Sequence, residues 1–162
     1  MKNKGEILAS ILRDYNYCYF FLHNTKEFKI VEKIMNEGFM FENQIPHSTD
    51  RVNPNEPIEI TYFLFQRKEY GQYTIVIAIP KEVYEKYTAM SEIFNTGIEE
   101  VITTTDPWTG DNDELMYVIS PRHVLGYFSI KTSEFIRNSN WDPGFDNSLV
   151  RKPAKRPVKP DV

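Results

Sequence analysis

A polar triplet, His23-Asn24-Thr25, follows the aromatic segment 17–22 and has residue types that could bind a ligand. Imidazole, amide and hydroxyl groups all form hydrogen bonds, and the end of a strand presents side chains from a rigid frame. A structural histidine, followed by a threonine that caps a helix, would leave the same pattern. The triplet therefore marks where a binding site would lie, and its role depends on the rest of the chain.

The spacing of other reactive residues argues against several kinds of chemistry. His23, His47, His123 and Cys18 lack the close pairs typical of zinc sites, so we expect no metal. Cys18 lies within an apolar segment with no basic residue near it, which is unfavourable for a reactive thiolate. The seven glycines are scattered, which argues against a phosphate-binding loop, and the elbow motif of serine hydrolases is missing from the sequence.

The triplet lies between a predicted strand and a predicted helix. Residues 17–22 are apolar on both faces, as in a strand covered on both sides. Glu27 stands three residues after Asn24, which is the spacing of a capping box, and Gly38 stands where a left-handed C-cap is expected. Four apolar residues between them fall on one helical face: Phe28, Val31, Ile34 and Met35.

The remaining sequence mixes strand and helix signals without an internal repeat. We expect helices over 5–14, 80–87 and 132–138, strands over 58–65, 73–79, 97–105, 114–119 and 124–130, and a loop over 40–57. With ten Tyr and eleven Phe, this pattern predicts one sheet-rich α+β domain over residues 1–142. Residues 143–162 are predicted to be a disordered, proline-rich basic tail, so ending the chain at Pro143 would leave folding intact.

Charge is distributed unevenly along the chain. Residues 1–150 carry 14 basic and 22 acidic side chains, a net charge of −8, whereas residues 151–162 carry five basic and one acidic. An acidic body is a poor partner for bare nucleic acid, because such binding depends on neutralising phosphates. The chain lacks an apolar run of membrane-spanning length and a signal peptide's apolar core. Together with the single cysteine, these features predict a cytoplasmic protein without membrane association.

Three segments together resemble ADP-ribosyltransferases of the diphtheria-toxin and poly(ADP-ribose) polymerase type. The first is Leu22-His23-Asn24-Thr25 with the helix that ends in Ile34-Met35-Asn36-Glu37-Gly38-Phe39. The second, Ile60-Thr61-Tyr62-Phe63, is similar to the family's next strand, and the third is Asn112-Asp113-Glu114-Leu115-Met116-Tyr117-Val118-Ile119. In the third, as in the family, a glutamate opens an apolar strand. The resemblance spans residues 17–131, keeps the order His, Tyr, Glu, and implies a split β-sheet flanked by short helices.

The resemblance implies an enzyme that cleaves the bond between nicotinamide and ribose in NAD and transfers ADP-ribose to a macromolecular acceptor, either protein or nucleic acid. Such an enzyme could serve as a toxin, an effector or a defence protein. Cleavage develops positive charge on the ribose, so a fixed carboxylate favours the transition state. Glu114 matches the residue that supplies this carboxylate. Without the resemblance, Glu114 would be a solvent-facing residue beside an acidic turn.

The other site residues follow from the same match. His23 and Thr25 would bind the adenosine ribose, and Asn24 would contribute backbone groups to the nicotinamide amide. Tyr62 belongs to the matched cofactor-binding segment. Tyr70 would stack on the nicotinamide ring; Tyr73 also fits the spacing, but it begins the strongest predicted strand and is more typical of a core.

Two alternatives use a related scaffold. An RNA 2′-phosphotransferase also consumes NAD but needs several arginines around the phosphate, so Arg51, Arg67 and Arg122 would converge on one cleft. A binding module without catalysis would keep the fold and a nucleotide cleft closed by aromatic side chains. Where these arginines and aromatic residues lie therefore discriminates between the alternatives.

Overall fold

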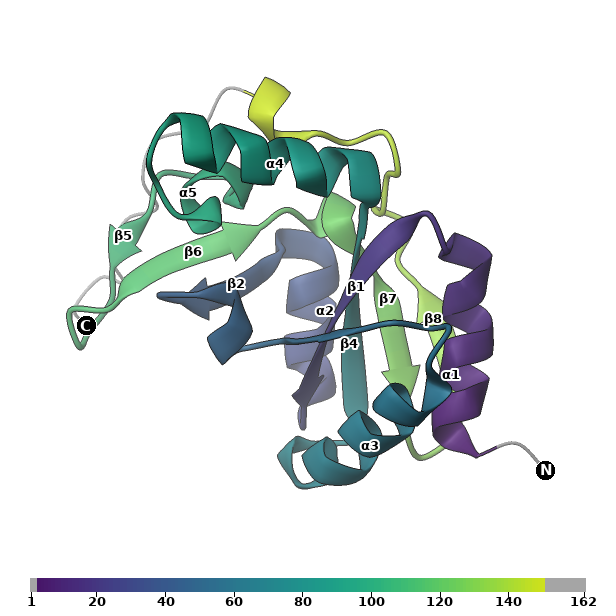
Figure 1. Cartoon of the computed structure of the whole chain (residues 1–162). Coiled ribbons are helices and arrows are strands. Elements are labelled where there is room, and N and C mark those ends of the chain that lie inside the picture. Colours follow the sequence, from purple (N-terminus) through teal and green to yellow (C-terminus); the bar gives the residue numbers. More distant parts are fainter. Residues whose placement is uncertain (1–2, 151–162) are drawn as a thin grey trace.

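The computed structural model describes residues 3–150, which form two antiparallel sheets and five α-helices (Figure 1). The larger sheet has the strand order β3-β1-β4-β7-β8, and the smaller sheet has the order β2-β6-β5. The predicted α+β class and the division of the strands between two sheets are confirmed. The strands are β1 Cys18–Thr25, β2 Phe39–Glu42, β3 Asp50–Val52, β4 Tyr73–Pro80, β5 Trp108–Thr109, β6 Leu115–Ile119, β7 Val124–Ser129 and β8 Glu134–Arg137. The helices are α1 Lys4–Leu12, α2 Phe28–Glu37, α3 Pro57–Arg67, α4 Lys81–Ile93 and α5 Ile98–Ile102.

The centre of the larger sheet is the pair β1 and β4, both predicted from their apolar sequences. Their register runs from Cys18 opposite Pro80 to Thr25 opposite Tyr73, so β1 is paired along its whole length. Full pairing holds the backbone of the last residues of β1 in a fixed place. The polar triplet is therefore presented from a rigid strand, as predicted.

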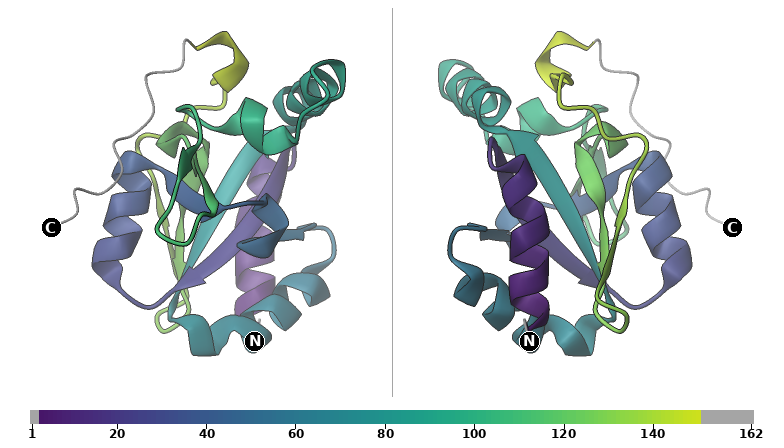
Figure 2. Two further views of the ribbon diagram at one scale, coloured as in Figure 1. Left: turned by 90° about the vertical axis from the view of Figure 1, so that its left-hand side faces the viewer. Right: turned by 90° about the vertical axis from the view of Figure 1, so that its right-hand side faces the viewer.

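Each face of the larger sheet has its own core. Helices α1 and α3 cover one face, where Leu8, Phe20 and Ile60 are fully buried. Helix α2, the smaller sheet and helices α4 and α5 cover the other face, so that α1 and α2 lie on opposite sides of β1 and β4 (Figure 2). Because side chains alternate along β1, His23 faces the smaller sheet and Asn24 faces α3.

Helix α2 ends at Gly38, as predicted, but its beginning differs from the prediction. Glu27 is the N-cap residue and makes no side-chain capping hydrogen bond, so the expected capping box is wrong. Gly38 has φ = +105°, outside the left-handed helical region, and a side chain there would clash with the carbonyl oxygen of Ile119. Glycine is thus required where the chain turns from α2 into β2.

The predicted strand over 58–65 is wrong, because these residues form α3. The segment is rich in aromatic and β-branched residues, which favour strands, but Pro57 begins a helix and the buried residues are spaced for one helical face. These buried residues are Ile60, Phe63 and Leu64. Close packing of α1 on α3 requires Gly5, since a side chain there would clash with Thr61.

Three shorter predictions are also wrong. Residues 98–102 form helix α5 instead of part of a strand, and residues 134–137 form edge strand β8 instead of a helix. The expected loop over 40–57 contains β3 and all of β2 except its first residue, and these strands are only three and four residues long. Such short elements contain too few residues to show a period.

The C-terminal part of the described chain packs against the body, contrary to the expected tail from residue 143. Phe145 is 6% exposed and Asn147 is 2% exposed. The side-chain amide of Asn147 donates to the carbonyl oxygens of Val101 and Thr103, at 2.9 and 2.7 Å. The domain therefore includes residues 143–150, and the rest of the expected tail, 151–162, lies outside the described residues. Over residues 3–150, the helices are too short and too polar to cross a membrane.

Candidate functional site

A cleft of about 320 Å³ opens where β1 ends. Its walls come from β1, from residues 46–50 between β2 and β3, and from the end of α3 with the short helix Lys68–Tyr70. His23, Asn24 and Tyr70 line it together. Three of the six predicted site residues thus meet in one place, although Tyr70 follows the triplet by 45 residues or more.

The imidazole of His23 is held in one tautomer. Nδ1 lies 2.7 Å from the carbonyl oxygen of Ser48, and a carbonyl oxygen can only accept, so Nδ1 carries the proton. Burial lowers the pKa of His23 below its ordinary value, against the opposing effect of the Ser48 hydrogen bond. The neutral ring therefore keeps a lone pair on Nε2, which makes no hydrogen bond within residues 3–150. Nε2 is an acceptor suited to a hydroxyl group.

The neighbouring aromatic ring fixes the plane of this imidazole. The rings of His23 and Phe39 pack edge to face, with centroids 4.9 Å apart. Phe39 begins β2, so this contact joins the larger sheet to the smaller one. His23 is consequently a polar residue at a contact between the two sheets.

Asn24 has a structural side chain. Its amide nitrogen donates to the carbonyl oxygens of Arg67 and Gly71, at 3.0 and 3.4 Å, and its oxygen accepts from the hydroxyl of Thr74 at 2.7 Å. These hydrogen bonds join β1 to β4 and to the end of α3. The side chain is therefore committed to folding, whereas the role that the resemblance implies for Asn24 involves its backbone groups.

We expect Asn24→Ala to lower the free energy of unfolding by about 2–4 kcal/mol, because buried partners would be left without hydrogen bonds. In a chain of this size the melting temperature should fall by roughly 5–10 °C. Thermal unfolding followed by circular dichroism measures the change. Asn36→Ala is the control, since Asn36 is an exposed amide on α2; equal melting temperatures of the two variants would contradict the structural role.

The cleft also contains an ion pair that the sequence did not indicate. The guanidinium of Arg67 contacts Oδ2 of Asp50 through NH2 at 3.1 Å and Nε at 3.2 Å. It also lies 5.7 Å from the centre of the Tyr70 ring. Tyr70 itself is 60% exposed, so one face of an aromatic ring is available beside a positive charge. Arg67 was predicted only as part of the phosphotransferase alternative, and because Asp50 and Arg67 share no sequence motif, their ion pair was not predicted.

Thr25 and Tyr62 lie outside this cleft. Thr25 is the last residue of β1 and pairs with Tyr73 of β4. Tyr62 is 62% exposed on α3 and is not a strand residue as the resemblance implied. Tyr73, the alternative for ring stacking, packs against Phe28 and Tyr127, so it belongs to an aromatic cluster.

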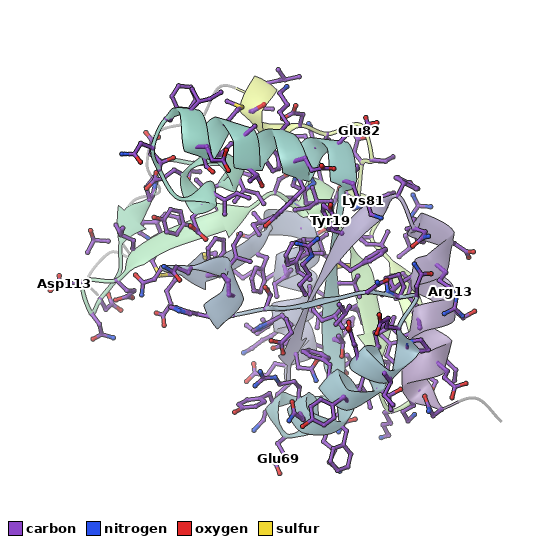
Figure 3. The ribbon with its side chains drawn as sticks, viewed as in Figure 1. Arg13, Tyr19, Glu69, Lys81, Glu82 and Asp113 are labelled. Carbon is purple, nitrogen blue, oxygen red and sulfur yellow. The ribbon has the colours of Figure 1, made fainter. Side chains whose placement is uncertain are left out.

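Glu114 lies at the turn between β5 and β6, away from the cleft. Its Oε2 accepts from the backbone N–H of Asn112 at 2.8 Å, so the carboxylate closes its own turn. Phe39 pairs with Ile119, and Glu114 precedes Ile119 by five residues, which is about 16 Å along a strand. Figure 3 shows the neighbouring Asp113 at the far tip of this hairpin, well away from Glu69, which precedes Tyr70.

The three arginines of the phosphotransferase alternative do not converge. Arg67 lines the His23 cleft, Arg51 lines a different cleft, and Arg122 lies over the ring of Phe145. Over residues 3–150, His, Cys, Asp and Glu side chains form no group of three that could hold a metal ion. Comparisons with models of protein families, with curated proteins and with solved structures found no match.

Proposed function

We propose that this protein binds NAD and transfers its ADP-ribose to a macromolecular acceptor. The observation that carries the proposal is His23, a neutral imidazole at the end of β1 whose Nε2 is open to a hydroxyl donor. The aromatic ring of Tyr70 in the same cleft adds support. NAD contains both groups that these two side chains could bind. Its ribose has a hydroxyl that can donate to Nε2 of His23, and it has a flat ring that can stack on Tyr70.

The proposed reaction begins when the bond between C1′ of the ribose and the nicotinamide nitrogen breaks, and its electron pair leaves with nicotinamide. The ribose then carries oxocarbenium character, which a carboxylate stabilises. A nucleophilic atom of the acceptor forms the new bond to C1′ and gives up its proton. In this proposal Glu114 supplies the carboxylate.

The proposal assigns His23 and Glu114 to different parts of NAD. NAD has two riboses, one on the adenosine side and one on the nicotinamide side of a pyrophosphate. His23 is proposed to bind the first and Glu114 to act on the second, so the two side chains need not touch. Because the Glu114 carboxylate is bound to the N–H of Asn112, this turn must rearrange when the nicotinamide ribose arrives.

That same hydrogen bond favours one alternative, a nucleotide-binding module without catalysis. If Glu114 only closes its turn, the His23 cleft binds NAD but the glycosidic bond stays intact. Incubation of the purified protein with NAD and a crude lysate distinguishes the two, with nicotinamide release and the mass of modified macromolecules as readouts. Release with adducts of roughly half a kilodalton is expected for the transferase, as glycosyl transfer requires. NAD binding without nicotinamide release would support the binding module without catalysis.

His23→Phe is expected to weaken NAD binding at least about tenfold, the loss of roughly one well-placed hydrogen bond. Phenylalanine keeps a ring against Phe39 but removes the Nε2 acceptor. Isothermal titration calorimetry measures the affinity, and the melting temperature reports whether the variant folds. His23→Ala tests the same bond without the ring. An unchanged NAD affinity in a folded variant would remove His23 from the site.

A further inference from the structure

A second cleft, of about 350 Å³, lies at the opposite end of β1. It is formed by the start of β1, the turn after β3, the start of α3 and the first residue of α4. The residues that line it are Asn16, Cys18, Tyr19, Arg51, Val52, Asn53, Pro54, Asn55, Glu59 and Lys81. None of these residues lines the His23 cleft, so the two clefts are separate.

Two cationic side chains gather around one tyrosine in this second cleft. The guanidinium carbon of Arg51 lies 3.9 Å from the centre of the Tyr19 ring, and Nζ of Lys81 lies 5.6 Å from the same centre. These distances limit the separation of the two charges to about 9.5 Å. Figure 3 shows Tyr19 and Lys81 together at the point where α4 begins.

Neither cation is neutralised by a carboxylate within residues 3–150. The ion pairs there join Lys29 to Glu27, Arg67 to Asp50 and Lys86 to Asp146. The one acidic residue that lines the cleft is Glu59, whose Oε1 accepts from the backbone N–H of Asn53. Two unpaired like charges repel each other, and a bound anion would remove that repulsion.

The position of Lys81 adds to this argument. It is the first residue of α4, a helix of 13 residues, where the helix dipole is positive. A lysine there is unfavourable for helix stability, and the following Glu82 makes no ion pair with it within the described residues. Residues 1–150 carry a net charge of −8, whereas the lining of this cleft has two cations and one carboxylate.

We propose that this second cleft binds a phosphate group. A guanidinium stacked on a ring still has its N–H edge free for two oxygens, while an ammonium acts as a point charge. A phosphate has enough oxygens to contact both at once. The volume exceeds that of the phosphate alone and falls in the range of small-ligand sites, so the phosphate is either free or carried by a nucleotide.

Titration of the ¹⁵N-labelled protein, followed by amide chemical shifts at constant ionic strength, tests this proposal. The probes are inorganic phosphate, adenosine 5′-monophosphate and uncharged adenosine, with chloride as the compensating ion. Saturable shifts are expected for the amides of Tyr19, Asn53 and Lys81 with the first two probes. Tighter binding of the monophosphate would indicate a nucleotide, and equal affinities would indicate phosphate alone.

Arg51→Gln and Lys81→Gln should each weaken phosphate binding about tenfold, as expected for the loss of a charged hydrogen-bond donor. Lys26→Gln, at an exposed lysine outside both clefts, should leave phosphate affinity unchanged. His23→Phe should also leave it unchanged, which separates this proposal from that of NAD binding. Shifts that do not saturate, or that persist in both cleft variants, would overturn the proposed phosphate site.

Discussion

Glu114→Gln is expected to lower the rate of nicotinamide release from NAD by a factor of about 100 or more, the range for loss of an electrostatic group that stabilises the transition state. Glutamine keeps the length of the side chain and an oxygen that can accept from the N–H of Asn112. It removes only the negative charge that opposes the developing oxocarbenium ion. NAD affinity should therefore stay nearly the same. Single-turnover nicotinamide release and calorimetric NAD titration measure the two quantities separately.

Glu42→Gln provides the matched control for this experiment. Glu42 pairs with Met116 in the smaller sheet, close in register to Glu114, and it is exposed. Loss of its charge tests whether any negative charge near the hairpin affects the rate of nicotinamide release. The transferase proposal predicts unchanged release in this control. Equal release from the Glu114 variant and the parent would rule out Glu114 as the catalytic carboxylate.

The part of the site that lies on β1 could be predicted because its signals are local. An aromatic run paired along its whole length with β4 fixes the strand, and His23 follows directly at its polar end. The rest of the cleft could not be predicted. The partner of His23 is the carbonyl oxygen of Ser48, and a backbone carbonyl has no signature in the sequence. The contact also depends on how residues 45–50 cross the end of β1.

The wrong strand prediction over 58–65 also explains why one predicted site residue, Tyr62, does not lie in the cleft. Reading residues 58–65 as a strand placed Tyr62 among cofactor-binding residues, whereas the helix leaves it in solvent. Tertiary packing decided the outcome, since Ile60, Phe63 and Leu64 bury one helical face against the larger sheet and α1. Aromatic and β-branched composition, on which the strand was predicted, is a weaker constraint than this packing.

The C-terminal segment is held by a buried polar network that the sequence also did not indicate. The hydroxyl of Tyr87 accepts from the backbone N–H of Asn147 at 2.8 Å and lies 2.7 Å from Nε2 of His123. Burial lowers the pKa of His123 to about 3, so the ring is neutral. Its Nε2 accepts a hydrogen bond from the hydroxyl of Tyr87. Phe145 packs edge to face on the same imidazole, with centroids 5.0 Å apart. Residues 143–150 thus complete a core that α4 and α5 leave open.

Ending the chain after Asp142 is therefore expected to destabilise the fold. Losing buried Phe145 costs about 3–5 kcal/mol, and the partners of Asn147 lose hydrogen bonds worth about 1 kcal/mol each. The melting temperature should fall by more than about 10 °C in a domain of this size. A chain ending at Val150 keeps every described contact and is the matched truncation. Asn147→Ala should reproduce part of the loss, and Leu149→Ala, at a 77% exposed side chain, none of it. An unchanged melting temperature after the Asp142 truncation would show that residues 143–150 do not stabilise the domain.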